Sequence, residues 1–311
     1  MRRFIIDTDP GIDDAFAIGL MMQSDVEILG ITTVSGNNGI DSVTVNALRL
    51  VNFFDRPEIN VYEGAGKPIL RKSGTSDGCH GTDGMGGTYL PVGDAKVDQK
   101  GAVDYLVETL RASDGEIEIL ALGPLTNLAL AIQKAPEAME KIKMIHSMGG
   151  GVNHGNITPF AEFNYWVDPE ATQVVFDFGI PIRMVGLNVT EQCIISPEEF
   201  ELLNEKGDRI SELYYKMQQH YSDHYKKRNG IDGAIIHDLV TAAAIFDESI
   251  VTFERQDVRV ETEGEKRGAT LIEPGNGKPV ELGIGVDVEK YKAYVFEHLF
   301  GISEAELKEL L

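Results

Sequence analysis

Four aspartates crowd into one eight-residue segment near the start of the chain. They are Asp7, Asp9, Asp13 and Asp14, within the sequence DTDPGIDD, and they follow the short apolar run 4–6. Like charges this close together cannot all ionise cheaply without a counter-cation. Oxygen ligands with no neighbouring His or Cys suit a hard cation. The segment therefore predicts a Ca²⁺ or Mg²⁺ site, although a polar turn before an acid-capped helix would use the same residues.

The elements around this segment predict an α/β fold. Short apolar runs that end in Gly, Asn or Asp alternate with apolar-periodic segments, which is typical of a mostly parallel, open sheet flanked by helices on both faces. The expected strands cover 4–6, 26–34, 116–122, 143–148 and 182–187, and the expected helices cover 13–22, 41–54 and 125–133. Ligands bind outside the carboxyl ends of strands in such sheets. The aspartate segment lies at one of these ends.

The rest of the chain shows no separable unit, so we expect a single domain over 1–311. Long loops are predicted for 64–97, for 149–165 and for the segment before His237, and such loops are usually functional or disordered. The turns within 258–286 predict short strands, which would form a small β-rich C-terminal addition. Helices close the chain.

Composition limits the possible partners. The chain has 311 residues and a formal net charge of −22, and a surface this acidic repels phosphate backbones and anionic lipids. We therefore expect neither nucleic acid nor a membrane as partner. Cys79 and Cys193 are too few for a disulfide framework or a zinc cluster. The first residues do not form a signal peptide, and no apolar run is long enough to span a membrane, so a cytoplasmic protein is expected.

The DTDPGIDD segment resembles the N-terminal signature of the inosine-uridine-preferring nucleoside hydrolases. The similarity continues in family order to about residue 250, through 35–37, 78–81, 122–127, 148–150, 155–156, 161–164, 167–171 and 237–238. The resemblance implies a Rossmann-like nucleoside hydrolase fold and hydrolysis of the N-glycosidic bond of ribonucleosides in nucleoside salvage. It also implies Ca²⁺ as cofactor, a small-molecule ribonucleoside as partner, and a homodimer or homotetramer.

The resemblance also implies a role for each matching position. The expected Ca²⁺ ligands are Asp9, Asp14, Asp238 and the backbone carbonyl of Leu122. The expected substrate-lining residues are Asp13, Asn37, His80, Met148, Asn156, Glu162, Asn164, Tyr221 and Tyr225. Asp9 would be the general base on a calcium-bound water, His237 would be the leaving-group acid, and Asp7 would orient the site from behind.

The chemistry of glycoside cleavage agrees with this set of residues. The transition state resembles an oxocarbenium ion, and carboxylate and amide oxygens stabilise such a charge as it develops. The aromatic and imidazole side chains are less decisive. A lone histidine such as His237 or His80 is often structural. Tyr221 and Tyr225 share one helix face. They could contact the base, or they could be ordinary half-buried residues of an amphipathic helix.

Three other functions stay open at this stage. The segment Asp7-Thr8-Asp9 after an apolar run also resembles the nucleophile motif of haloacid-dehalogenase-type phosphatases, although the residues that follow do not. A non-enzymatic nucleoside binder would use the same pocket, and so would a hydrolase of a non-standard riboside. The preference for purine or pyrimidine bases is open too. One departure from the family pattern is Leu239, where many members carry Pro.

Overall fold

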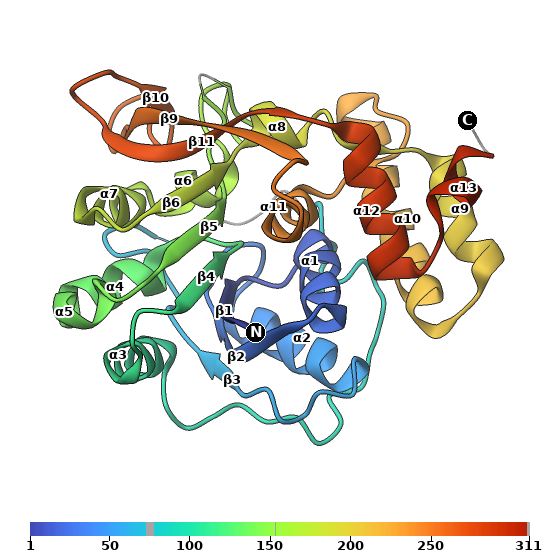
Figure 1. Cartoon of the computed structure of the whole chain (residues 1–311), viewed down its shortest axis with the longest axis horizontal. Coiled ribbons are helices and arrows are strands. Elements are labelled where there is room, and N and C mark those ends of the chain that lie inside the picture. Colours follow the sequence, from blue (N-terminus) through green and yellow to red (C-terminus); the bar gives the residue numbers. More distant parts are fainter. Residues whose placement is uncertain (73–77, 153, 310–311) are drawn as a thin grey trace.

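A nine-stranded sheet forms the centre of the computed structural model, which describes residues 1–72, 78–152 and 154–309 (Figure 1). The strand order is β10-β9-β11-β6-β5-β4-β1-β2-β3. The strands of this sheet are β1 (Arg2–Thr8), β2 (Val26–Thr33), β3 (Val61–Glu63), β4 (Ile117–Ala121), β5 (Met144–Met148), β6 (Ile182–Val185), β9 (Val251–Val260), β10 (Thr270–Ile272) and β11 (Lys278–Val286). All neighbours from β3 to β11 pair in parallel, whereas β9 pairs antiparallel with both β11 and β10.

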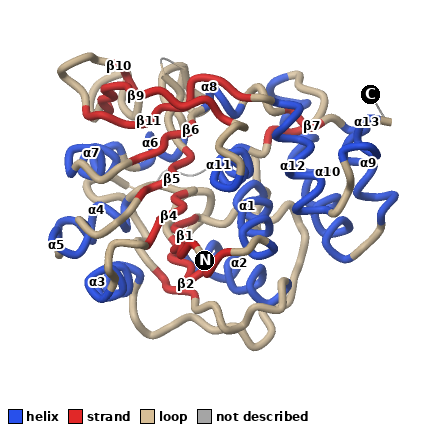
Figure 2. Tube along the Cα trace, in the orientation of Figure 1, coloured by secondary structure: helices blue, strands red, loops and turns tan. Residues whose placement is uncertain are grey.

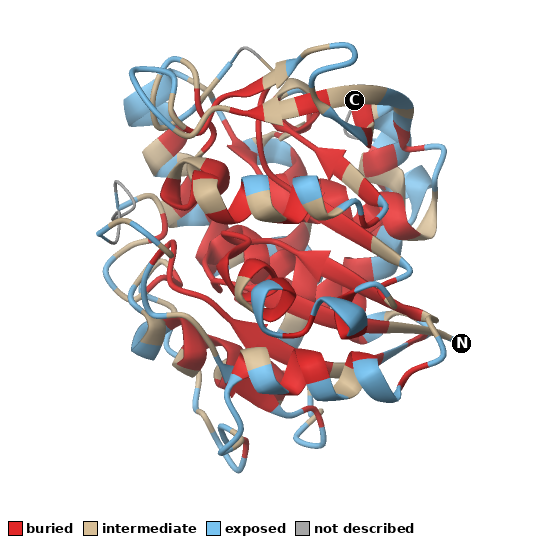
Figure 3. Ribbon diagram, turned by 90° about the vertical axis from the view of Figure 1, so that its left-hand side faces the viewer, coloured by how far each residue is buried: buried red, intermediate tan, exposed pale blue. Residues whose placement is uncertain are grey.

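The parallel strands are buried on both faces, as their apolar sequences predict. In β1, Phe4 and Ile6 pack into one hydrophobic cluster while Ile5 packs into the other, because successive side chains of a strand point to opposite faces. Figure 3 shows the buried strands between the inner faces of the helices. The carboxyl ends of the parallel strands therefore meet at one edge, where the site lies.

Helices cover both faces of the sheet (Figures 1 and 2). One face carries α3 (Ala102–Ala112), α4 (Thr126–Lys134), α5 (Pro136–Met139) and α7 (Pro169–Phe178). The other face carries α1 (Ile12–Gln23), α2 (Ile40–Phe53), α11 (His237–Phe246) and α12 (Val288–Phe300). Each set contributes its apolar side chains to a separate cluster. This is the layered arrangement that the strand and helix alternation predicts.

The remaining elements surround the carboxyl edge and the far side of α1. They are α6 (Phe163–Val167), α8 (Leu187–Thr190), α9 (Pro197–Lys206), α10 (Arg209–Asn229), α13 (Glu304–Lys308) and the antiparallel pair β7 (Ile194–Ile195) and β8 (Ala234–Ile235). The long helix α10 begins after Asp208, whose side chain accepts a hydrogen bond from the Ser211 N–H at 2.8 Å, and ends at Gly230 in the left-handed conformation. Such caps satisfy the free ends of a helix. Among the described helices, none is both long and apolar enough to cross a membrane.

Most predicted elements are present, with boundaries that differ by one or two residues at most ends, but two expectations need correction. The segment before His237 is not a long loop, because α10 reaches Asn229 and β8 follows at Ala234. The C-terminal strands are also longer than predicted: β9 begins at Val251, and β11 pairs in parallel with β6. The β-rich C-terminal part therefore continues the main sheet. Within the long loop 64–97, residues 73–77 lie outside the described residues.

Candidate active site and metal centre

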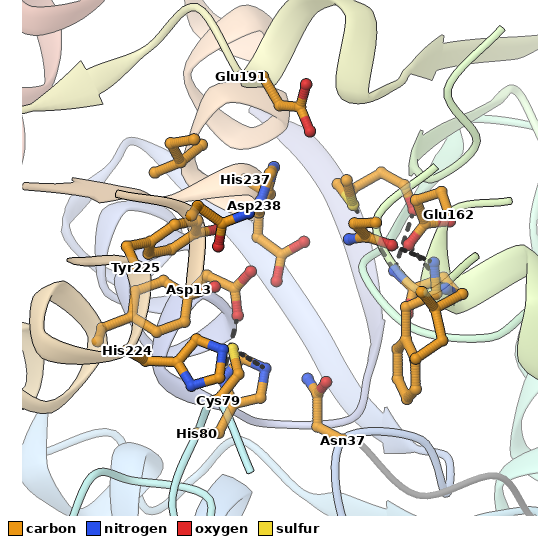
Figure 4. Close-up of a pocket in the computed structure, with 18 of the residues that line it drawn as sticks. Asp13, Asn37, Cys79, His80, Glu162, Glu191, His224, Tyr225, His237 and Asp238 are labelled. Carbon is orange, nitrogen blue, oxygen red and sulfur yellow. Dashed lines mark hydrogen bonds and ion pairs between the residues drawn. The ribbon is translucent and has the colours of Figure 1, made fainter. Parts of the chain in front are cut away.

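A cavity of about 400 Å³ opens at the carboxyl edge of the parallel strands. Its wall contains twelve of the residues that the sequence analysis singled out: Asp13, Asn37, His80, Leu122, Met148, Asn156, Glu162, Asn164, Tyr221, Tyr225, His237 and Asp238. The other two expected metal ligands, Asp9 and Asp14, are fully buried and accept hydrogen bonds from the wall residue Asn37. Figure 4 shows Asp13, Asp238, His80 and His237 on one side of the cavity and Glu162 on the other.

Carboxylates form the floor of the cavity. Oxygens of Asp13, Asp14 and Asp238 lie within 4.8 Å of one another, and all three side chains are buried. Asp14 is held in place by the Gly11 N–H at 2.9 Å and by the Thr8 hydroxyl, both of which donate to its carboxylate. These donors come from the last residue of β1 and from the turn that leads to α1, so the local chain path fixes the position of the carboxylate.

Asp9 lies just beyond this trio and has one oxygen without a partner. Its Oδ2 accepts a hydrogen bond from the Asn37 N–H at 2.6 Å, while its Oδ1 has no hydrogen-bond partner among the described residues. Two glycines leave room for this carboxylate: a Cβ at Gly123 would lie 2.6 Å from Oδ1, and a Cβ at Gly36 would overlap Oδ2. A buried carboxylate oxygen normally finds a partner. The unpartnered Oδ1 therefore points to a group that is absent from the protein chain itself.

The electrostatics of the floor also favour a bound cation. Burial, followed by repulsion from Asp14, raises the pKa of Asp9 well above its usual range. Burial raises the pKa values of Asp13 and Asp14 to about 6, and burial with repulsion from the other aspartates raises that of Asp238. A divalent cation bound among these four carboxylates would offset their mutual repulsion and stabilise their ionised forms. An all-oxygen donor set fits a hard cation such as Ca²⁺ or Mg²⁺.

The opposite wall presents polar side chains that are hydrogen-bonded to the backbone. Glu162 caps α6, and its carboxylate accepts hydrogen bonds from the N–H groups of Gly150 at 2.9 Å and Asn164 at 2.6 Å. The Asn164 amide donates to the carbonyl oxygens of Leu122 at 2.8 Å and Met148 at 3.3 Å. Burial nevertheless raises the pKa of Glu162 to about 7.

His80 reaches the cavity from the loop 64–97 and docks on the start of α1. Its Nδ1 accepts a hydrogen bond from the Ile12 N–H at 3.1 Å, and its Nε2 lies 3.6 Å from Cys79 Sγ. Burial lowers its pKa to about 4, so the ring is neutral near pH 7. Because Nδ1 accepts, the single ring proton is on Nε2.

His237 belongs to a chain of hydrogen bonds along the same wall. Its Nδ1 lies 2.6 Å from Thr190 Oγ1, and its Nε2 lies 2.8 Å from the Tyr225 hydroxyl. Tyr225 is in turn hydrogen-bonded to Tyr221, which donates to the Asp13 carboxylate. Burial lowers the pKa of His237 to about 3, so this ring is also neutral. Both ring nitrogens are occupied by protein groups.

The sequence analysis missed several residues at this site, and two of them bear on its chemistry. Cys79 lines the cavity, and Thr190 contacts His237 from α8. Neither has a sequence signal of its own, since a single Thr or Cys at the end of a short element is common anywhere. Asp7, expected behind the site, is fully buried, and its Oδ1 accepts hydrogen bonds from Thr32 at 2.6 Å and Asn127 at 2.8 Å.

Comparison with known proteins agrees with this geometry. The family described as inosine-uridine preferring nucleoside hydrolase matches residues 4–293. Uridine nucleosidase 1 of Arabidopsis thaliana is 40% identical, over 94% of this chain and 92% of its own. The structure of a plant nucleoside hydrolase, PpNRh1, superposes with a TM-score of 0.90 at 35% identity, covering 96% of this chain and 98% of that one. A purine-preferring ribonucleoside hydrolase from Gardnerella vaginalis gives 0.91 at 28%, covering 98% and 100%.

The match covers nearly the whole chain, and it includes every strand and loop that supplies the cavity. It also covers the Asp7-Thr8-Asp9 segment, whose resemblance to a phosphatase motif had left a phosphatase function as an alternative. The relatives act on nucleosides by hydrolysis, as their names state. The chain therefore belongs to the inosine-uridine preferring nucleoside hydrolase family, a family of enzymes that hydrolyse ribonucleosides.

Proposed function

We propose that this enzyme is a Ca²⁺-dependent ribonucleoside hydrolase that releases ribose and a free base, and that it prefers uridine. The observation that carries the proposal is the cluster of buried carboxylates with an unpartnered Asp9 oxygen, facing a polar wall across one cavity. The preference for uridine is inferred from the name of the Arabidopsis relative, which is more similar in sequence than the purine-preferring one. Free base and ribose would then return to nucleoside salvage.

The carboxylates would have two roles, which are to bind the cation and to accept a proton. Asp9, Asp14, Asp238 and the Leu122 carbonyl are the proposed ligands, and Asp13 lies close enough to join them. When bound, the cation would supply Lewis-acid activation of water and an anchor for the vicinal ribose hydroxyls. Asp9 would also accept the proton of the attacking water, because its buried carboxylate has one oxygen without a partner among the described residues.

The wall opposite the carboxylates would hold the sugar. Asn37, Asn156, Glu162 and Asn164 present oxygen and amide groups to the cavity beside Met148. Oxygens on both sides of the ribose would stabilise the positive charge that develops in an oxocarbenium-like transition state. Since these groups are already fixed by backbone hydrogen bonds, they would need little reorganisation during the reaction.

The departing base would receive its hydrogen bond from a tyrosine hydroxyl. His237 is the leaving-group residue expected from the sequence, but both of its nitrogens are engaged and its pKa is lowered to about 3. We therefore propose that His237 acts through Tyr225, whose side chain lines the cavity beside Tyr221. His80, with its proton on Nε2, is a further donor at the same wall.

The proposal is tested by measuring free ribose from uridine, cytidine, inosine and adenosine. The purified enzyme is assayed as prepared, after treatment with a chelator, and after Ca²⁺ is added back. We expect chelation to abolish ribose release, Ca²⁺ to restore it, and uridine to give the highest kcat/KM. Full activity after complete removal of the metal would refute the Ca²⁺ dependence, and a higher kcat/KM for inosine would refute the base preference. A parallel assay with 4-nitrophenyl phosphate is expected to show no phosphatase activity.

A further inference from the structure

Thr190 is the residue through which α8 contacts the catalytic wall. It is fully buried at the end of α8, which follows β6 at the carboxyl edge of the sheet. Its Oγ1 lies 2.6 Å from Nδ1 of His237. A hydroxyl in a helix often bonds to the carbonyl four residues earlier. Here, within the described part of the chain, His237 is its one hydrogen-bond partner.

The direction of this hydrogen bond follows from counting hydrogens. A buried hydroxyl needs an acceptor for its hydrogen, and the acceptor available to Thr190 is Nδ1 of His237. The neutral ring then carries its proton on Nε2, so Nε2–H donates to the Tyr225 oxygen at 2.8 Å. The hydroxyl hydrogen of Tyr225 must therefore point away from His237. Without substrate this hydrogen lies toward Tyr221, which in turn donates to Asp13, and a base bound in the cavity would take the place of Tyr221 as its acceptor.

We propose that Thr190 is a positioning residue that fixes the Nε2–H tautomer of His237 and thereby aims the Tyr225 hydroxyl at the leaving base. The inference rests on the proposed function, since it assigns a partner to the leaving-group residues of that reaction. Thr190 is not among the residues that line the cavity. It acts through His237 and Tyr225.

Replacing Thr190 with Val removes the hydroxyl and keeps the branched shape. Nδ1 then loses its donor, and the Nδ1–H tautomer is no longer excluded. In that tautomer Nε2 accepts from the Tyr225 hydroxyl, which turns the hydrogen away from the base. A leaving base such as uracil loses its donor, whereas 4-nitrophenolate needs none because it departs as a stable anion. The effect of the substitution should therefore depend on the leaving group.

The test compares wild type, Thr190→Val and Thr190→Ser on uridine and on 4-nitrophenyl β-D-riboside. We expect Thr190→Val to lower kcat on uridine by about ten- to a hundredfold, with KM changed less than about threefold. This loss is smaller than most of the roughly 10²–10⁴ that a positioned acid contributes, because the Tyr225 hydroxyl itself is retained. Activity of the same variant on 4-nitrophenyl riboside should stay within about twofold of wild type. Thr190→Ser keeps the hydroxyl and should retain most of the activity on uridine.

Two results would overturn the inference. One is an equal loss on both substrates in Thr190→Val, because a general structural defect affects both leaving groups. The other is a Thr190→Ser variant as impaired on uridine as Thr190→Val. If Thr190→Val does not fold, the same comparison is made with Thr190→Cys, whose thiol is only a weak donor. Failure of wild type to release ribose from any riboside would instead refute the proposed function, so the two failures are distinguishable.

Discussion

Asp9 is the side chain on which the chemistry depends most directly. It is fully buried, one of its oxygens has no partner, and burial together with Asp14 raises its pKa. Replacing it with Asn keeps the shape but removes both the proton acceptor and a negative charge. We expect Asp9→Asn to lower kcat/KM for uridine by about a thousandfold or more, since a general base alone contributes about 10²–10⁴. Steady-state kinetics with saturating Ca²⁺ measure this loss.

Asp177→Asn provides the matched control for Asp9. Asp177 lies in α7 and is exposed, so the same chemical change there should leave kcat/KM within about twofold of wild type. Calcium affinity of the Asp9 variant, measured by calorimetry, separates the two expected roles. Near-normal turnover by Asp9→Asn would remove Asp9 from the mechanism, even if the calcium affinity fell.

Two loops confine Asp9, one after β2 and one after β4. Gly36 and Gly123 belong to these loops, and a side chain at Gly36 would overlap Asp9 Oδ2. We expect Gly36→Ala to displace the carboxylate and to lower both calcium affinity and kcat/KM by about 10- to 100-fold, the usual cost of disturbing the support of a metal ligand. Calorimetry and ribose release measure the two effects.

Gly39→Ala is the control for this loop, because no atom lies within 4 Å of a Cβ placed there. Gly39 is the N-cap of α2, where Ala is less favourable than Gly, so the exchange costs about 1 kcal/mol of stability without a clash at the site. The variant should bind calcium and turn over as wild type does. Equal losses in both variants would show that any extra methyl group in this loop is harmful and that Asp9 is not the cause.

The elements that hold the site could be predicted where the sequence pattern is strong. Apolar runs such as residues 4–6 and 26–34 predict buried strands, and the polar residues that follow them mark the carboxyl edge. The pattern fails for β9, where charged and exposed residues such as Glu254 and Arg255 interrupt the apolar pattern of the strand. It also fails for Thr190. No local spacing reveals a contact with His237, which is 47 residues away in sequence and comes close only when α8 and α11 pack together.

The sheet as a whole keeps its two edges chemically distinct. The carboxyl edge gathers carboxylates that, among the described residues, form no ion pair with Lys or Arg in the floor, and their mutual repulsion favours a bound cation. At the other edge of the sheet, basic side chains surround Glu118 of β4. Arg2 donates to Glu118 at 2.5 Å, Lys143 at 3.0 Å, and His146 lies 2.9 Å away. A carboxylate with three such partners needs no metal, and its role is structural.

This contrast predicts that Glu118 affects stability and not catalysis. Burial raises the pKa of Glu118, but the hydrogen bonds from His146, Arg2 and Lys143 lower it more, so the net shift is downward. A carboxyl with a lowered folded-state pKa contributes stability above its unfolded pKa of about 4.5, and this contribution is lost as the pH falls further. Glu118→Gln should therefore lower the free energy of unfolding by about 2–4 kcal/mol at pH 7, and the deficit should shrink between pH 5 and pH 3. Denaturant titrations across this pH range measure the deficit.

Glu116→Gln is the control for this prediction. The Glu116 side chain is half-exposed and pairs with Arg3, so this substitution should cost less than about 1 kcal/mol. Both variants should hydrolyse uridine as wild type does, and a fall in kcat/KM in Glu118→Gln alone would show that the two edges are coupled.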